Sequence, residues 1–241
     1  MTTCSVICRA NWAASSHNPR LTATMKTAAT YTIHSKTRSF RLVISVGSIT
    51  NFWYPTSPNK LAIVNAANER CVGGGGVDKA ISEAGGLSLF KDRLLLPHKK
   101  AGDAATNVRC KTGDAVINGP NAYGNLKTSY VIHAVGPDYR FCEETQGDRK
   151  LLRAYRASLE RAKEAKLEAV AFSLLSCGAY RGDKSVKELV RIGMKAIQSF
   201  HAYDELVEVR MCAFSWEDAD ALVEVAFEMG LSANPKLNKI V

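Results

Sequence analysis

A run of four glycines, Gly73 to Gly76, closely follows a short apolar segment, and this pairing constrains the fold more than any other feature of the sequence. The segment 61–65 (LAIVN) is continuous and apolar, which is typical of a strand buried on both faces. Four glycines leave the backbone without side chains, so its N–H groups can approach an anion closely. The following helix would add the positive end of its dipole. The pattern predicts an α/β sheet with an anion-binding loop beyond the strand.

The remaining sequence alternates strand and helix patterns, which predicts a sheet that is parallel over much of its extent and covered on both faces by helices. Ligands bind beyond the carboxyl ends of the strands in such sheets, so the loops after Asn65, Leu175 and Ala213 should meet. Strands are expected at 29–35, 39–46, 61–65, 115–118, 129–135, 169–175 and 206–214; helices at 77–83 (ended by Gly85 and Gly86), 149–166, 184–200 and from a cap at Ser215; loops at 51–60, 97–112 and 138–148.

The 241 residues suit a single domain with a short extension, which we place at residues 28–241 and 1–27. The net charge is +9, yet no acidic residue precedes Glu69. A basic leader rich in Ser, Thr and Ala is typical of a mitochondrial transit peptide, but it also fits a disordered leader or an extension before an internal start at Met25. We therefore expect an intracellular protein, either mitochondrial or cytoplasmic and nuclear. Because the folded part is nearly neutral, we expect no nucleic-acid partner.

Several site classes are excluded by composition. Seven scattered cysteines without C-x-x-C spacing indicate reduced thiols, and no metal site is legible among the isolated histidines. No apolar stretch approaches the roughly 20 residues of a membrane helix. We expect no cofactor, no metal, no membrane association and a monomer.

The first candidate site combines Asn68 with Asp78, on either side of the glycine run. The Asn68 amide suits ribose hydroxyls, and Asp78 can hold a hydroxyl or a water for attack. Taken alone, Asp78 is more readily interpreted as a helix cap. A phosphate loop of the NTPase type needs Gly-Lys-Ser/Thr, and a dinucleotide fingerprint needs glycine where Asp78 stands, so both are excluded.

The second candidate loop, 176–182 (SCGAYRG), also follows a buried strand and precedes a helix. Cys177 is more simply a passive backbone donor than a nucleophile, because no histidine is assigned to activate it. Phe214 ends a strand at the predicted ligand edge, where an aromatic ring can stack on a base. A core phenylalanine is an equally good interpretation.

These motifs resemble the macrodomain family. The runs LAIVNAAN, GGGGVDKAI, GDAVIN, YVIHAVGP and SLLSCGAYRG occur in the family's order over roughly residues 40–229, and the spacing from Asn68 to Asp78 resembles that of MacroD-type hydrolases. The resemblance implies a three-layer α/β/α sandwich on a mixed, largely parallel sheet. It implies ADP-ribose and O-acetyl-ADP-ribose as ligands and mono-ADP-ribosylated proteins as partners. The implied reactions are removal of mono-ADP-ribose from acidic side chains of proteins and deacetylation of O-acetyl-ADP-ribose.

The resemblance also assigns roles to individual positions. Asn68 and Asp78 match the catalytic pair at the distal ribose, and Tyr180 matches the aromatic residue that packs on that ribose. Phe214 matches the adenine-stacking position. The remaining implied ligand contacts are Ser48, Ile49, Asn65, Ala66, Gly75, Gly76, Val77, Ser176, Cys177, Gly178 and Ala179.

Two departures from the family pattern bear on binding. Ser48 replaces the acid that accepts a hydrogen bond from the adenine amino group, which costs about 1.5–3 kcal/mol if nothing compensates. Adenine recognition should therefore be retained but less stringent. Arg181 stands where the pattern has its last glycine. Its side chain can either reach a phosphate or point to solvent, and we favour solvent.

The same pocket also fits a reader module that binds ADP-ribose without catalysis. Only the hydrolase needs Asn68 and Asp78 together, and both are present. A more distant alternative is a binder of RNA or poly-ADP-ribose that uses the basic leader.

Overall fold

The computed structural model describes residues 25–98 and 107–233. Residues 1–24 of the predicted leader therefore lie outside the described residues. Strand β1 already begins at Lys26, two residues before the expected domain boundary. The elements in chain order are β1 (Lys26–His34), β2 (Ser39–Val46), η1 (Ile49–Asn51), η2 (Pro58–Lys60), β3 (Leu61–Ala66), α1 (Gly76–Leu95), β4 (Ala115–Asn118), β5 (Tyr130–Ala134), α2 (Glu144–Glu164), β6 (Ala169–Ser173), α3 (Val186–Gln198), β7 (Glu208–Ala213) and α4 (Trp216–Glu228).

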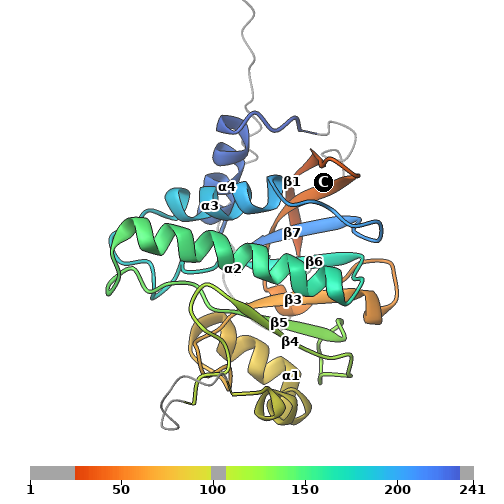
Figure 1. Ribbon diagram of the computed structural model, residues 1–241. Coiled ribbons are helices and arrows are strands. Elements are labelled where there is room, and N and C mark those ends of the chain that lie inside the picture. The colour runs from red at the N-terminus through yellow and green to blue at the C-terminus, as the bar shows by residue number, and fades with distance from the viewer. Residues whose placement is uncertain (1–24, 99–106, 234–241) are drawn as a thin grey trace, which may run out of the picture.

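The strands form one mixed sheet of seven strands in the order β1-β2-β7-β6-β3-β5-β4 (Figure 1). The five inner strands β2, β7, β6, β3 and β5 are parallel to one another. The edge strands β1 and β4 are antiparallel to β2 and β5, respectively. The prediction of a largely parallel, mixed sheet is confirmed.

Alternate side chains of the central strands enter two different cores. In β3, Ala62 and Val64 pack with buried residues of α2, α3 and α4, whereas Leu61 and Ile63 pack with α1, η1 and the loop around Tyr123. The apolar run predicted to be buried on both faces is therefore buried on both faces. The result is three layers, with α2 and α3 side by side across one face of the sheet in Figure 1.

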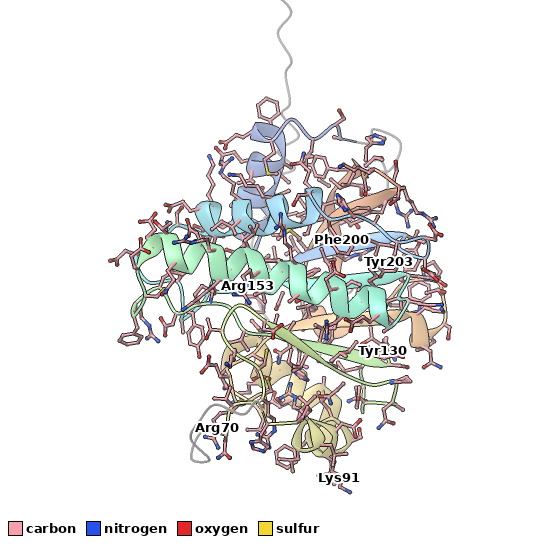
Figure 2. All side chains as sticks on the ribbon, in the orientation of Figure 1. Arg70, Lys91, Tyr130, Arg153, Phe200 and Tyr203 are labelled. Atoms are coloured by element: carbon pink, nitrogen blue, oxygen red, sulfur yellow. The ribbon has the colours of Figure 1, made fainter. Side chains whose placement is uncertain are left out.

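Helix α2 shows how the sequence pattern positions a helix. Leu151, Tyr155 and Leu159 recur at helical spacing and are fully buried against the sheet, while Arg153 is exposed on the outer side (Figure 2). The helix begins at Glu144, five residues earlier than expected, because the Glu143 carboxylate accepts hydrogen bonds from the backbone of residues 145 and 146.

Helix α1 confirms the expected break at its glycines but is longer than expected. Gly86 has φ 60° and ψ −155°, which are not helical values, so the first helical piece ends at this glycine pair, and a second piece that the sequence did not predict continues to Leu95. The Ala84 carbonyl freed by the bend accepts a hydrogen bond from the Asn125 backbone N–H at 2.7 Å.

The polar segment 97–112 is only partly described, and its end is not an exposed excursion. Arg109 and Cys110 are buried, and both backbone N–H groups donate to the Glu69 carbonyl. This end therefore packs against the loop after β3. None of the described helices combines the length and the apolar character needed to cross a membrane.

Candidate functional site

The carboxyl ends of the five parallel strands lie at one edge of the sheet and bring the predicted loops together. The Gly47 backbone N–H after β2 donates to the Ala213 carbonyl at the end of β7 at 3.0 Å. The Ser176 hydroxyl after β6 donates to the Pro137 carbonyl after β5 at 2.7 Å. Because β3, β6 and β7 are parallel neighbours, the loops after Asn65, Leu175 and Ala213 leave the sheet at the same edge, as expected.

The glycine run forms an open backbone surface at the start of α1. Gly73 and Gly76 have φ of 124° and 57°, values that glycine adopts without strain. Gly75 is the N-cap residue and supplies no side-chain cap. A Cβ added at Gly75 or Gly76 would meet no atom within 4 Å. Gly74, Gly75 and Gly76 are exposed, so the start of α1, whose first N–H groups have no partner within the helix, lies at the surface with the positive end of the helix dipole, the arrangement that binds anions.

Asn68 and Asp78 meet at Gly74. A Cβ on Gly74 would lie 3.0 Å from Oδ2 of Asp78 and 3.2 Å from Nδ2 of Asn68, so a larger residue at this position would push one of these side chains away by a few tenths of an ångström. The Asn68 amide donates to the Gly73 carbonyl at 2.9 Å and accepts from the Arg70 backbone N–H at 3.0 Å. Asn68 and Asp78, which were identified as a candidate pair from the sequence, thus lie close to each other on either side of Gly74.

Asp78 is almost fully buried, with 2 % of its surface exposed, and is not a simple helix cap. Its Oδ1 atom lies 2.9 Å from Nη2 of Arg93 and accepts a hydrogen bond of 2.9 Å from the Asn65 amide. Within the described residues, Oδ2 has no hydrogen-bond partner. The carboxylate is therefore held through one oxygen, while the other lies beside Gly74.

Asn65 differs from its expected role. Its side chain has no exposed surface and contacts Asp78 on one side and His133 on the other, so it supports the aspartate from behind instead of lining a ligand surface. Sequence reasoning missed His133 and Arg93. The available signal was that Asn65 and His133 are polar residues in buried strands, where each needs a partner.

His133 extends this buried network across the sheet. Its Nδ1 lies 3.1 Å from the Asn65 amide nitrogen and its Nε2 lies 3.0 Å from Oδ1 of Asn118. Burial, together with the nearby Arg93 guanidinium, holds the pKa of His133 well below its usual value. The ring is therefore neutral, and the contacts fit a proton on Nε2 that is donated to Asn118, with Nδ1 accepting from Asn65.

The second loop presents its backbone rather than its side chains. Ser176 has φ 60° and is buried, whereas Gly178 and Ala179 are exposed. Burial raises the pKa of the Cys177 thiol to about 12, so it stays protonated at neutral pH. This agrees with its interpretation as a passive backbone donor and argues against a nucleophile.

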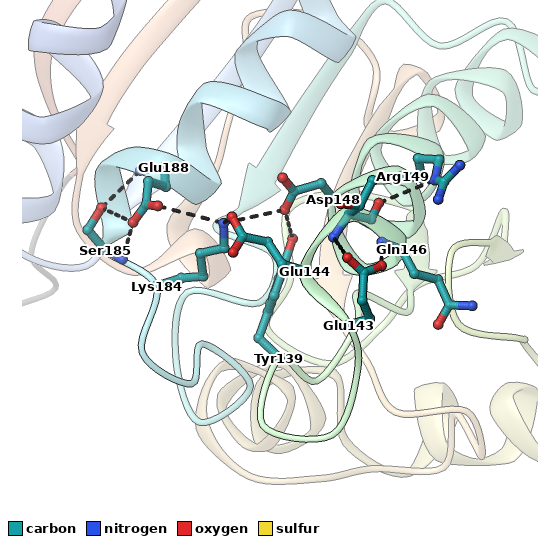
Figure 3. A network of polar contacts seen from close by, with 10 residues as sticks. Tyr139, Glu143, Glu144, Gln146, Asp148, Arg149, Lys184, Ser185 and Glu188 are labelled. Carbon is teal, nitrogen blue, oxygen red and sulfur yellow. Dashed lines mark hydrogen bonds and ion pairs between the residues drawn. The ribbon is translucent and has the colours of Figure 1, made fainter.

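The far end of this loop is anchored by Lys184 (Figure 3). Its ammonium pairs with Glu144 and lies 3.8 Å from Asp148 and 3.6 Å from Glu188, thereby joining the start of α2 to the start of α3. Tyr139 donates to Asp148 at 2.9 Å. These contacts fix the segment on which the loop rests.

Tyr180 and Arg181 complete that loop. The Tyr139 backbone N–H donates to the Tyr180 carbonyl at 2.8 Å, which ties the half-buried Tyr180 to the anchored segment. Arg181 is exposed, in line with the expectation that it points to solvent.

The third part of the site lies after β2 and β7. Phe214 is 85 % exposed, which excludes the core interpretation and leaves its ring available for stacking. Ser48 is half-buried and its hydroxyl lies 2.7 Å from that of Thr50. Ile49 is buried among core residues, so it supports this region from beneath. Ala66 and Val77 are half-buried at the ends of β3 and the glycine loop.

No group of three or more His, Cys, Asp or Glu side chains suited to a metal ion occurs among the described residues. The polar atoms at the site are backbone N–H groups, one amide and one carboxylate. This set can bind an anion next to hydroxyl groups and place a water beside them.

Comparisons with known proteins agree with this geometry. The sequence model of a family described as "Macro domain" matches residues 64–188. A macro domain-containing protein of Caldanaerobacter subterraneus is 40 % identical over 157 residues, which are 65 % of this chain and 82 % of that protein. An O-acetyl-ADP-ribose deacetylase of Pantoea vagans is 34 % identical over 165 residues, with 68 % and 89 % covered.

Solved structures of macrodomains are similar to this chain in fold. The macrodomain of Oceanobacillus iheyensis with ADP has a TM-score of 0.67 at 27 % identity and covers 86 % of this chain and 98 % of its own. The Trypanosoma brucei macrodomain in complex with ADP-ribose has a TM-score of 0.59 at 27 % identity, with 76 % and 68 % covered.

Proposed function

This chain belongs to the macro domain family, and from that premise we propose that it binds ADP-ribose at the carboxyl edge of its sheet and hydrolyses esters of it. The substrates proposed are proteins that carry mono-ADP-ribose on acidic side chains, and O-acetyl-ADP-ribose. Support for ADP-ribose comes from the solved relatives bound to ADP or ADP-ribose, and support for ester hydrolysis comes from the relative named as a deacetylase.

The observation that carries the proposal is the meeting of Asn68 and Asp78 at Gly74, next to the open start of α1. In the proposed complex the backbone N–H groups of 75–77 and 176–180 hold the diphosphate. Phe214 stacks on adenine, and Tyr180 packs on the distal ribose.

We propose catalytic roles for Asn68 and Asp78 from the same geometry. Asn68 fixes a hydroxyl of the distal ribose, and Oδ2 of Asp78 orients or deprotonates a water. That water cleaves the ester, which gives ADP-ribose and a free carboxylate. No metal takes part in these proposed steps.

One observation favours a reader module that binds without catalysis. Oδ2 of Asp78 has less than 1 Å² of exposed surface, so a water reaches it only if the glycine loop shifts. In the reader interpretation Asp78 shapes the loop and does not act on a water.

Calorimetric titration with ADP-ribose, followed by turnover of O-acetyl-ADP-ribose and of a glutamate-modified protein, separates the two. A hydrolase binds and turns over, and Asn68→Ala or Asp78→Ala abolishes turnover. Asp220→Ala, which removes an exposed carboxylate on α4, should leave turnover unchanged. A reader binds without turnover. If titration gives neither heat nor a thermal shift, both functions are refuted.

A further inference from the structure

The structure pairs Asp78 with a buried arginine from the same helix, although the two residues are far apart along it. Fifteen residues of straight helix would separate their Cα atoms by about 22 Å, too far for an ion pair. The bend at Gly86 returns the second half of α1 toward its start, as the two differently oriented pieces of α1 in Figure 1 show. Nη2 of Arg93 thereby lies 2.9 Å from Oδ1 of Asp78.

Arg93 is fixed beneath the glycine loop. Its side chain is 1 % exposed, and Nη1 donates to the Ser82 hydroxyl at 2.9 Å, which in turn donates to the Asp78 carbonyl at 2.6 Å. A Cβ on Gly73 would lie 3.9 Å from Nη1. The Arg93 guanidinium therefore contacts the Asp78 carboxylate directly and the Asp78 backbone carbonyl through Ser82, directly under the glycine loop.

Among the described residues, Arg93 is the cation that pairs with Asp78. Asp78 is buried, and His133, which faces it from β5 through Asn65, is held neutral because its pKa is lowered. Without Arg93 a bare carboxylate would lie under the first turn of α1, where the diphosphate is proposed to bind. A buried charge without its partner is strongly unfavourable, and a second negative charge nearby adds repulsion.

We infer that Arg93 is a positioning residue that neutralises Asp78 on its Oδ1 side, so that a dianionic diphosphate can bind beside this carboxylate while Oδ2 is left without a hydrogen-bond partner among the described residues. This inference rests on the proposed function. It assigns Arg93 a role in ligand binding and activity that acts through Asp78, not by contact with the ligand.

The test is a double-mutant cycle on ADP-ribose binding, with adenosine as a probe that lacks phosphate. Arg93→Met should weaken ADP-ribose binding at least tenfold and change adenosine binding by less than about twofold. Adding Asp78→Asn should restore most of the lost ADP-ribose affinity but no turnover. Arg93→Lys, which keeps the charge, should remain within about threefold of the wild type in ADP-ribose affinity.

Arg153→Met is the matched control, because it removes one positive charge from the exposed face of α2 (Figure 2). It should leave affinity and turnover unchanged. If Arg93→Met does not fold, the double variant should fold, because the uncompensated carboxylate is gone.

Three results would overturn the inference. Arg93→Met may bind ADP-ribose as tightly as the wild type, it may lose affinity for adenosine equally, or the double variant may neither fold nor bind better than the single one. Wild-type titration is run first: absence of binding there refutes the proposed function, whereas binding with an unaffected Arg93→Met variant refutes this inference alone.

Discussion

The neutral histidine in the sheet should make folding stability depend on pH in a measurable way. His133 is fully buried, and its pKa is lowered well below the usual 6.5 by burial and by Arg93. In the unfolded chain the ring takes up a proton below pH 6.5, while the folded protein does not. The stability associated with the neutral ring is fully present above pH 6.5 and is lost as the pH falls from 6.5 toward the lowered pKa.

The size of the effect follows from that difference in proton uptake. With an unfolded pKa of 6.5 and no uptake in the folded state, this one group lowers the free energy of unfolding by about 2 kcal/mol between pH 7 and pH 5. The limiting slope is about 1.4 kcal/mol per pH unit. Other groups titrate in the same range, so the effect must be isolated by substitution.

The assay is urea unfolding at pH 7 and pH 5 for the wild type and for His133→Gln, a neutral side chain that retains hydrogen-bonding groups facing Asn65 and Asn118. The variant is expected to start less stable but to lose about 2 kcal/mol less between the two pH values. His201→Gln, on an exposed side chain, should behave like the wild type. Equal losses in the wild type and in His133→Gln would refute the assignment of a buried neutral ring.

Three further predictions concern the proposed site. Gly74→Ala places a methyl group 3.0 Å from Oδ2 of Asp78. Because the ion pair with Arg93 limits how far Asp78 can move, kcat/KM should fall at least tenfold. Turnover at the wild-type rate would contradict this geometry. Phe214→Ala should cost about 1–3 kcal/mol of ADP-ribose affinity, roughly fivefold to 150-fold, whereas Phe227→Ala, at 82 % exposure, should change nothing in the same titration. Cys177→Ser should retain turnover within about twofold, because a thiol with a pKa of about 12 is not a thiolate at pH 7; a complete loss would reinstate a nucleophile.

Features encoded by local patterns could be predicted from the sequence. Strands β2 and β4 begin and end where the apolar periodicity places them, and Ser215 caps α4 by accepting from the Asp218 backbone N–H. The position of the two loops at the carboxyl edge followed from the alternation of strand and helix patterns, because that alternation predicts parallel strands whose ends lie at one edge. Periodicity and glycine placement are properties of short segments, which makes them legible without a structure.

Features that depend on tertiary contact could not be predicted. The start of α2 was missed because residues 138–148 were expected to form a loop, whereas in the structure the helix includes Gly147, where a Cβ would lie 2.7 Å from the Tyr139 ring and 3.0 Å from the Cys142 sulfur. The ion pair between Asp78 and Arg93 depends on a bend whose angle no local pattern specifies. Tertiary packing overrides propensity in both cases.

The glycine run itself shows why position within a motif matters more than composition. A side chain at Gly74 would displace what lies behind it, since Asp78 and Asn68 crowd the space a Cβ would need. Gly75 and Gly76 meet nothing within 4 Å, so no contact within the protein excludes a side chain there. What these two positions leave uncovered is the start of α1, whose first N–H groups have no partner within the helix. A single run of identical residues therefore reports an internal packing constraint at Gly74, between the two proposed catalytic side chains, and an uncovered surface at Gly75 and Gly76.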